Sequence, residues 1–311
     1  MASQGDKMTP PKMLFFSHGN ICNYRCVFCA NPHIQAGDRL KLDYDWIKKY
    51  EDLISTAEIA DISGYGEVML CPDFERIMEL FKYYKVKATF STNGFAIADK
   101  IPFLKMCLIK HLNFSINAIH EDTYQRISGG CGNLRSVLSN FDKLREGRDF
   151  AISVSIVLNK WIIPELIEWT EFMISKRPDE IRMLPMTNIR DRDYKTRLDN
   201  NPLEISEEDK PIIEKARRMV LDSGIWLHPT GFVRDKNGIK EKKKKCKAPW
   251  EQLVIEWDGL LASCCWRHED CMGNTNNATW QQIWESEKYQ DLRNSIKDGG
   301  GKYCEDCREY G

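Results

Sequence analysis

The sequence has almost no net charge and no long apolar run. Its 311 residues include 45 Lys and Arg against 46 Asp and Glu, so the formal charge at pH 7 is −1. Such a chain has no strong field to attract nucleic acid or an anionic membrane surface. The N-terminal segment MASQGDKMTP lacks the apolar region of a signal peptide, and no apolar run reaches the length of a membrane span. These absences predict a cytoplasmic protein with neither a membrane nor nucleic acid as its partner.

Cysteine, by contrast, is abundant. The chain has 12 cysteines, although thiols in the cytoplasm stay reduced and seldom form disulfides. Many unpaired cysteines in a reducing compartment indicate metal binding. Three of them, Cys22, Cys26 and Cys29, lie within the short stretch ICNYRCVFCA.

Short apolar runs alternate with segments of helical periodicity from about residue 12 to residue 186. The predicted strands cover residues 13–17, 59–64, 86–94, 111–117, 150–158 and 181–186, and intervening segments such as 43–55 and 73–84 are predicted helices. This alternation implies a parallel sheet with helices packed outside it. Six strand–helix units are too few for a closed eight-unit barrel, so the expected fold is α/β, an open partial (β/α)6 TIM-like barrel. Its reactive residues are expected at the C-terminal ends of the strands, as in full barrels.

The rest of the chain differs in composition. Residues 187–245 are polar and lysine-rich, with a predicted helix over 206–224 whose N-cap is Ser206. The lysine run at 240–247 is interpreted as a solvated linker rather than a nucleic-acid patch. From residue 246, a hairpin turning at Asp258 and Gly259 and a helix over 279–297 predict a small α+β domain. The predicted division is a barrel core (1–186), a linker with a helix (187–245) and a small C-terminal domain (246–311).

The three clustered cysteines have the spacing Cys-x3-Cys-x2-Cys and follow the first predicted strand. Thiolates bind iron strongly, and iron–sulfur clusters are usually held by cysteines at short spacings. Three protein ligands leave one iron of a four-iron cluster open to another ligand. The alternatives are a zinc site or chance clustering, but structural zinc normally has four protein ligands, and neither His33 nor a fourth cysteine has an obvious spacing.

This spacing, with Phe28 directly before the last cysteine, resembles the signature of the radical S-adenosylmethionine enzymes. SGYGE at 63–67 is similar to their glycine–glycine–glutamate motif, in which glycines let the backbone approach the cofactor and a glutamate, here Glu67, faces its ammonium group. STNG at 91–94 ends the third predicted strand, and residues 114–130 resemble the family's fourth-strand segment, although the family often has aspartate at the position of Asn117. The residues expected to contact S-adenosylmethionine are Phe28, Gly64, Tyr65, Gly66, Glu67, Thr92, Asn93, Ser115 and Asn117.

The resemblance also implies the chemistry. Cys22, Cys26 and Cys29 would hold a 4Fe–4S cluster whose open iron binds the amino and carboxylate groups of S-adenosylmethionine. Reduction by an electron donor such as flavodoxin or ferredoxin would release a 5′-deoxyadenosyl radical, which abstracts hydrogen from an unactivated carbon. The protein would position that C–H bond and exclude competing donors.

A second group of cysteines lies in the C-terminal region. Cys246 and Cys264 are separated by 17 residues, and Cys304 and Cys307 form a Cys-x2-Cys pair. This arrangement resembles the short "twitch" form of the auxiliary-cluster domain of radical S-adenosylmethionine enzymes, and residues 255–307 also resemble the longer SPASM form. The resemblance implies an auxiliary 4Fe–4S cluster that is held by these four cysteines and transfers electrons. A zinc site with four cysteine ligands is the alternative.

The predicted reaction is hydrogen abstraction from a small polar metabolite, such as a sugar or an aminocyclitol, followed by oxidation or epimerisation. The short auxiliary domain is similar to that of the aminocyclitol dehydrogenase of this superfamily, in which an auxiliary cluster accepts an electron. Epimerisation would instead need a thiol that donates hydrogen, and Cys265 and Cys271 are the candidates. The alternatives are a radical maturase or epimerase acting on a ribosomal peptide and, from another class, a non-catalytic iron–sulfur or zinc scaffold.

Overall fold

One sheet runs through the described parts of the chain. The computed structural model describes residues 8–17, 19–29, 31, 42–64, 66–186, 204–228, 246–265 and 271–297. Within them the strands are ordered β10-β9-β8-β1-β2-β3-β4-β5-β6-β7. Their bounds are β1 (Met13–Ser17), β2 (Ile59–Asp61), β3 (Lys87–Thr92), β4 (Ile109–Ser115), β5 (Ala151–Leu158), β6 (Glu180–Pro185), β7 (Trp226–Leu227), β8 (Gln252–Glu256), β9 (Leu260–Ala262) and β10 (Cys271–Asn274). Neighbouring strands from β8 to β7 are parallel, whereas β9 pairs antiparallel with both β8 and β10.

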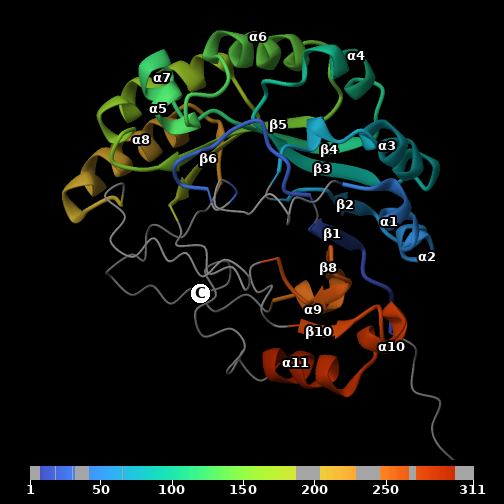
Figure 1. Cartoon of the computed structure of the whole chain (residues 1–311). Coiled ribbons are helices and arrows are strands. Elements are labelled where there is room, and N and C mark those ends of the chain that lie inside the picture. The colour runs from blue at the N-terminus through green and yellow to red at the C-terminus, as the bar shows by residue number, and fades with distance from the viewer. Residues whose placement is uncertain are drawn as a thin grey trace, which may run out of the picture.

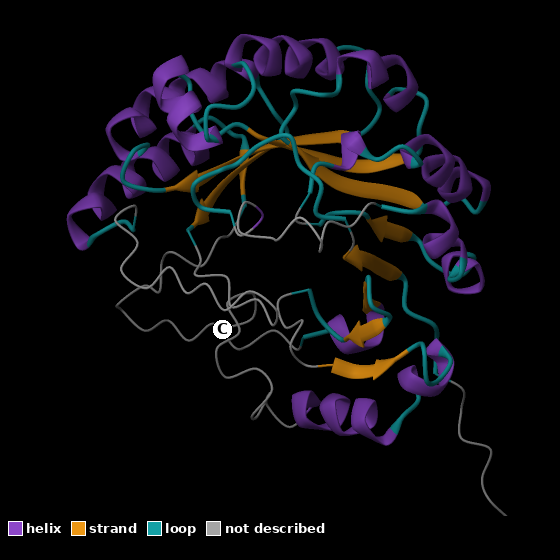
Figure 2. Cartoon of the chain, viewed as in Figure 1, coloured by secondary structure: helices purple, strands orange, loops and turns teal. Residues whose placement is uncertain are grey.

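Helices follow the outer face of the parallel part of this sheet (Figures 1 and 2). The described helices are α1 (Tyr44–Lys48), α2 (Glu51–Ile54), α3 (Phe74–Tyr83), α4 (Ile101–Leu104), α5 (Glu121–Ser128), α6 (Leu134–Arg145), α7 (Leu166–Lys176), α8 (Lys210–Asp222), α9 (Ala248–Glu251), α10 (Trp280–Trp284) and α11 (Glu287–Lys297). The curved sheet, with helices along its convex side, is an open partial barrel, so the predicted fold class is confirmed. The predicted strands of the barrel correspond to β1 through β6.

The two faces of the sheet differ in chemistry because successive side chains of a strand point to opposite faces. The outer face is apolar: Phe90 of β3 packs edge-on against Phe74 of α3 with ring centroids 5.6 Å apart, and Phe114 of β4 packs in the same way against Phe141 of α6 at 5.2 Å. The alternate residues of β2 to β7 form what we call the inner face, and most of them are polar.

The helix predicted over 43–55 is wrong in one respect, because two short helices replace it. α1 ends at Lys48 and α2 begins at Glu51. Tyr50 lies at the break, is buried, and packs edge-on against Trp46. Its hydroxyl also bonds to Thr275 Oγ1 at 3.0 Å. The break therefore places Tyr50 against the C-terminal part of the chain.

The helix predicted over 279–297 is also divided in two. α10 ends at Trp284, and Ser286 starts a new helix because its Oγ accepts a hydrogen bond from the Tyr289 backbone N–H at 3.3 Å. The predicted N-cap at Ser206 is confirmed, since Ser206 and Asp209 form a capping box ahead of α8.

The C-terminal region extends the sheet. β8 pairs with β1 along five residues, from Met13 opposite Gln252 to Ser17 opposite Glu256. The predicted hairpin follows, with Gly259 at φ +82° between β8 and β9. Because β8 is hydrogen-bonded to the first barrel strand, the sheet continues past residue 246, and the division at 186 and 245 stays a prediction. No helix in the described ranges is both long and apolar enough to cross a membrane.

Candidate active site

The cysteine loop, residues 19–29, leaves the C-terminal end of β1. Cys22, Cys26 and Cys29 are each partly buried on it, and Phe28 packs against the core beside them. The turn is closed by a hydrogen bond from the Cys29 N–H to the Cys26 carbonyl at 3.0 Å. The three predicted ligands therefore share one short loop at the end of the barrel where its chemistry is expected.

One side of the cysteine loop is held by the end of α5. The N–H groups of Arg25 and Val27 donate to the carbonyls of Ser128 and Ile127, each at 3.0 Å. Gly129 then ends the helix at φ +71°, and a Cβ there would lie 2.5 Å from the Arg25 carbonyl oxygen. Backbone-to-backbone contact of this kind fixes the loop, and it leaves no space for a side chain at residue 129.

The other side of the cysteine loop is held by the SGYGE segment. The Glu67 N–H donates to the Ile21 carbonyl at 2.8 Å. A Cβ on Gly66 would lie 2.6 Å from the Ile21 oxygen and 2.9 Å from its nitrogen. A pocket opens here, and its lining includes Gly19, Ile21, Gly64, Gly66 and Glu67. Gly66 thus permits a close approach to the backbone of the cysteine loop, whereas the approach of these glycines to the cofactor stays a prediction. Tyr65 lies outside the described residues.

The carboxylate of Glu67 joins this segment to the end of β3. Oε1 accepts from the Thr92 hydroxyl at 2.7 Å and from the Met69 N–H at 3.1 Å, and Oε2 accepts from the Asn93 N–H at 2.6 Å. The side chain is buried, and burial raises the pKa of Glu67 although these hydrogen bonds act in the opposite direction. A carboxylate has about four acceptor positions, so three of them are used within the protein.

Asn93 completes the connection between β3 and the cysteine loop. Its Nδ2 donates to Asn23 Oδ1 at 2.7 Å, and its Oδ1 accepts from the Phe95 N–H at 3.0 Å. Asn23 directly follows Cys22, so a displacement of the β3 end would be transmitted to the first thiol. Sequence reasoning missed Asn23, although its place inside the cysteine motif was a usable signal.

The three thiols fit an iron–sulfur cluster. Burial raises the pKa of the Cys22 thiol to about 11 and also raises the pKa values of Cys26 and Cys29, with the neighbouring thiols adding to the effect at Cys22 and Cys26. A cationic iron centre would stabilise the thiolates that this burial disfavours. Across the described residues no three His, Cys, Asp or Glu side chains converge as ligands of one metal ion. The arrangement suits thiols that each bind a different iron of one cluster better than it suits a single zinc ion.

Two of the predicted cofactor contacts lie on β4 or directly after it. Ser115 is the last residue of β4 and lies opposite Ser155 of β5. Asn117 is buried, and its Oδ1 accepts from the Val157 N–H at 2.8 Å. In the structure Asn117 therefore ties the end of β4 to β5, and its contact with the cofactor stays a prediction.

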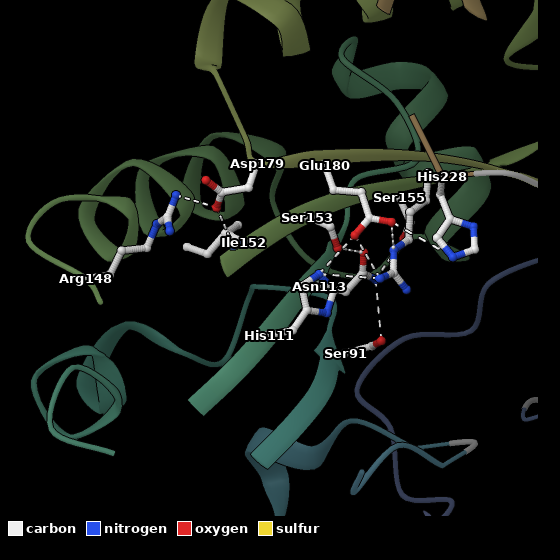
Figure 3. A network of polar contacts seen from close by, with 11 residues as sticks. Ser91, His111, Asn113, Arg148, Ile152, Ser153, Ser155, Asp179, Glu180 and His228 are labelled. Carbon is white, nitrogen blue, oxygen red and sulfur yellow. Dashed lines mark hydrogen bonds and ion pairs between the residues drawn. The ribbon is translucent and has the colours of Figure 1, made fainter. Parts of the chain in front are cut away.

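A polar network lies on the inner face (Figure 3), and sequence reasoning did not select its central residue, Asn113. Asn113 of β4 lies at its centre: Nδ2 donates to Ser155 Oγ at 2.9 Å and Oδ1 accepts from Ser153 Oγ at 2.7 Å. Ser91 on the neighbouring strand β3 is within 3.4 Å of the same Nδ2. Polar residues at alternate positions of β4 and β5 were the signal that could have revealed it.

A charged group continues this network onto β6 and β7. Glu180 is buried and accepts from Nε and Nη2 of Arg182, each at 3.0 Å, while His111 Nε2 lies 3.4 Å and His228 Nε2 4.0 Å from its carboxylate. Burial alone would raise the pKa of Glu180, but the hydrogen bonds from His111 and Arg182 together lower it below its ordinary value. On β2, Asp61 accepts from the Thr89 hydroxyl at 2.5 Å, so the polar lining reaches from β2 to β7.

The predicted auxiliary ligands are described in part. Cys246 precedes α9 and Cys264 follows β9, and both are partly buried, whereas Cys304 and Cys307 lie outside the described residues. Ala262 lies opposite Val254, so the chain leaves β9 toward the end of the sheet at which β1 begins. The cysteine loop leaves β1 at its other end, about 13 Å away at ~3.3 Å per residue.

The two candidate hydrogen donors lie on the auxiliary side of the sheet. Cys265 follows Cys264 directly. Cys271 begins β10, and its thiol donates to the Gly273 carbonyl at 3.3 Å. Cys131, which the sequence analysis did not select, lies nearer to the cysteine loop: its carbonyl accepts from the Ser128 hydroxyl at 2.6 Å, and the Ser128 carbonyl accepts from the Arg25 N–H of that loop.

Clustered thiols at the end of the first strand of a partial barrel define a metal-cluster enzyme of the barrel class. The family model of the radical SAM superfamily, where SAM denotes S-adenosylmethionine, matches residues 16–169, and that of the SPASM iron-sulfur cluster-binding domain matches residues 246–308. The chain belongs to the radical SAM superfamily and carries a C-terminal SPASM-like domain. A 4Fe–4S cluster, an auxiliary iron–sulfur cluster and S-adenosylmethionine are therefore its cofactors.

Curated relatives are distant. The GTP 3',8-cyclase of Clostridium botulinum (strain Hall) is 24% identical over 177 residues, which cover 54% of this chain and 54% of that protein. A probable GTP 3',8-cyclase of Saccharolobus islandicus (strain M.14.25) is 23% identical over 267 residues, covering 81% and 82%. The chain thus spans about half the length of the Clostridium relatives that it matches.

Solved structures share the fold. SuiB of Streptococcus suis superposes with a TM-score of 0.65 at 15% identity, covering 92% of this chain and 68% of SuiB. The enzyme anSMEcpe with bound AdoMet superposes with a TM-score of 0.64 at 15% identity, covering 91% and 79%. At these identities the likeness establishes the fold alone.

Proposed function

We propose that the chain abstracts hydrogen from a small polar metabolite, such as a sugar or an aminocyclitol, and oxidises it. The observation that carries this proposal is the polar lining of the inner face. Its members on β2 to β6 and just after β7 are Asp61, Thr89, Ser91, His111, Asn113, Ser115, Ser153, Ser155, Glu180, Arg182 and His228. A substrate rich in hydroxyl or amino groups can exchange hydrogen bonds with such a surface.

We further propose a division of roles among the residues. Cys22, Cys26 and Cys29 hold the first cluster, and Cys246, Cys264, Cys304 and Cys307 hold the second. When bound, the first cluster supplies the electron that cleaves S-adenosylmethionine to a 5′-deoxyadenosyl radical, and the second supplies an acceptor for the electron that substrate oxidation releases. Glu67, Asn93 and Asn23 keep the cysteine loop in place through hydrogen bonds.

Oxidation is favoured over epimerisation by the positions of the candidate thiols. In an oxidation the substrate loses one hydrogen atom and then one proton and one electron, so that a secondary alcohol becomes a ketone. An epimerase must instead return a hydrogen atom from a donor near the substrate. Cys265 follows the end of β9, which points to the end of β1 opposite the cysteine loop. The Cys271 thiol already donates a hydrogen bond to the Gly273 carbonyl. These positions argue against either of them as the donor.

A nucleoside triphosphate, suggested by the names of the curated relatives, fits the described inner face less well. Triphosphates are bound by several converging cations. On the described strands the carboxylates of Asp61 and Glu180 face the inner side. The cations on this face of those strands are Arg182, which is already engaged by Glu180, and Lys87 at the exposed start of β3. The inner face is therefore close to neutral. We do not propose GTP as the substrate, but it is included among the compounds tested below.

A peptide is the second candidate. SuiB bound to precursor peptide SuiA superposes on 92% of this chain with a TM-score of 0.63, and anSMEcpe has been solved with bound peptides. A partial barrel of this kind therefore has room for a peptide substrate, and polar peptide groups would also suit the inner face.

The test is a reductive S-adenosylmethionine cleavage assay in deuterated water with reconstituted protein. Panels of sugars, aminocyclitols, short peptides and GTP are each added, and the product mass is followed. We expect a sugar or aminocyclitol to stimulate the cleavage of S-adenosylmethionine and to be converted to a product that is two mass units lighter. The same result is expected in the Cys265→Ala and Cys271→Ala variants. An inverted centre carrying solvent deuterium would show epimerisation, and stimulation only by peptides or GTP would replace the substrate class. No cleavage in any arm would support a non-catalytic scaffold.

A further inference from the structure

The buried face of α11 carries an arginine. Residues Tyr289, Leu292, Arg293 and Ile296 of this helix are buried, at the spacing of one helix face. Arg293 is 1% exposed and Tyr289 is fully buried. Arginine is almost never buried to this degree unless an anion accompanies it.

Neutral groups occupy most of the contacts of Arg293. Its Nε donates to the Pro249 carbonyl at 2.9 Å and its Nη1 to the Trp284 carbonyl at 2.8 Å. The guanidinium also lies over the rings of Trp284 and Tyr289, 4.4 Å and 4.3 Å from their centroids. These contacts orient the side chain, but none of them supplies a full negative charge.

Two polar atoms of this pair have no hydrogen-bond partner in the described part of the chain. They are Nη2 of Arg293 and the hydroxyl of Tyr289. A buried donor that lacks an acceptor is unfavourable, and more so when it is charged. Two such donors side by side in one small region therefore indicate an anionic acceptor that is bound there.

Each of the two donors is linked to one described cysteine of the auxiliary site. Pro249, which accepts from Arg293, is three residues beyond Cys246. On the other side, burial raises the pKa of Tyr289, the nearby Arg293 opposes this rise, and a charge on Cys264 adds to it, so Tyr289 lies within electrostatic range of Cys264. An acceptor held by Cys246 and Cys264 would thus be near both donors.

We propose that Arg293 and Tyr289 donate hydrogen bonds to the sulfur atoms of the auxiliary cluster and so raise its reduction potential. A cluster held by four thiolates has a net negative charge, and net charge and hydrogen bonds to sulfur are among the features that set such potentials. Both residues are positioning and tuning residues, since they act through the cluster. This inference rests on the presence of the auxiliary cluster and is independent of which substrate the enzyme oxidises.

The experiment measures the potential of the auxiliary cluster alone. In a background with Cys22, Cys26 and Cys29 changed to alanine, full-length protein is reconstituted with iron and sulfide and titrated with dithionite under electron paramagnetic resonance. Tyr289→Phe removes only the hydroxyl, so we expect the reduction equilibrium to fall roughly ten-fold, a shift of about 59 mV to lower potential for a one-electron couple. Arg293→Met should lower the potential further because it removes charge, and Arg293→Lys should fall between Arg293→Met and the parent.

Two matched controls separate this role from general effects. Tyr50→Phe removes a hydroxyl that bonds to Thr275, at the contact of the barrel with the C-terminal part. Lys288→Met removes one positive charge from α11, but Lys288 is exposed, so solvent screens it. Both should keep the parent potential.

The proposal is overturned if Tyr289→Phe and Arg293→Lys retain about four irons and each change the reduction equilibrium less than two-fold. It is also overturned if the site takes up zinc and no iron. Should Arg293→Met fail to fold, the potentials of the two conservative variants still decide. A failure to oxidise any metabolite would contradict the proposed function but would leave these potentials unchanged.

Discussion

Gly66 is the position where one added carbon should uncouple the cysteine loop from the barrel. A Cβ there would lie 2.6 Å from the Ile21 oxygen and 2.9 Å from the Ile21 nitrogen, whereas ordinary contact begins at 3.4 Å. Both atoms are backbone and cannot turn away as a flexible side chain would. In Gly66→Ala the loop must therefore withdraw by most of an ångström, which also strains the bond from the Glu67 N–H to the Ile21 carbonyl.

The magnitude follows from these contacts. Overpacking in a tight site costs about 1–3 kcal/mol, and the weakened hydrogen bond adds about 0.5–1.5 kcal/mol. Gly66 does not have a positive φ, so strain from the new side chain's backbone preference contributes little. Ile21 precedes Cys22 directly, so the displacement should act on the first thiol before it acts on the rest of the fold.

The assay is anaerobic reconstitution followed by iron and sulfide analysis and by urea unfolding. We expect Gly66→Ala to keep the auxiliary iron, about four per chain, while it loses the radical cluster and S-adenosylmethionine cleavage. Gly147→Ala is the matched control: its φ of +65° makes alanine unfavourable, yet nothing lies within 4 Å of the added carbon. That variant should lose stability and keep both clusters. Full iron loading with normal cleavage in Gly66→Ala would refute the reasoning.

Three further predictions follow from buried or bridging carboxylates. Glu67→Gln places an amide where three donors now point, so it should lower the free energy of unfolding by about 1–3 kcal/mol. It should also weaken S-adenosylmethionine binding, measured by equilibrium dialysis, roughly ten-fold. Lost stability with unchanged affinity would show that Glu67 is a structural residue only. The folded-state pKa of Glu180 is lowered from 4.5, so its contribution is complete above pH 4.5 and is lost as the pH falls through the folded value. In urea unfolding, the parent should therefore have a higher free energy of unfolding than Glu180→Gln at pH 5, and this difference should shrink as the pH falls to 3. A difference that does not change with pH would exclude this linkage. Asp52 accepts from Trp280 Nε1 at 2.8 Å and Gln281 Nε2 at 3.0 Å. Asp52→Ala should therefore speed proteolysis of the C-terminal region. Lys110→Ala, a control at an exposed position of β4, should not change the rate of proteolysis.

Much of the fold was predictable because the signals are local. The strands of the barrel carry apolar residues toward the outer face, and this pattern can be read in the sequence whatever the strands pair with. The cysteine loop was equally accessible, since its ligand spacing lies within eight residues. Local chemistry also located the cap at Ser206 and the turn at Gly259.

The parts that sequence reasoning missed depend on contacts between distant residues. Tyr50, at the break between α1 and α2, bonds to Thr275, which is 225 positions away. His111 and Glu180 are brought together by strand pairing across β5, and no local pattern announces that register. Glu67 was selected from the SGYGE segment, but its hydrogen bonds with Thr92 and Asn93 became visible only when β3 lay beside the loop that follows β2.

The position of β1 explains how one sheet can serve two clusters. Its C-terminal end continues into the cysteine loop, and its partner β8 begins directly after α9, close to Cys246. Parallel pairing forces the start of β8 to lie beside the start of β1, so the described auxiliary cysteines and the cysteine loop occupy opposite ends of the same pair of strands. In the proposed assignment of the cysteines, the two clusters are separated by about the length of a strand, ~13 Å. In the proposed oxidation, a substrate on the inner face would lie beside these strands and would lose its hydrogen atom toward one end and its electron toward the other.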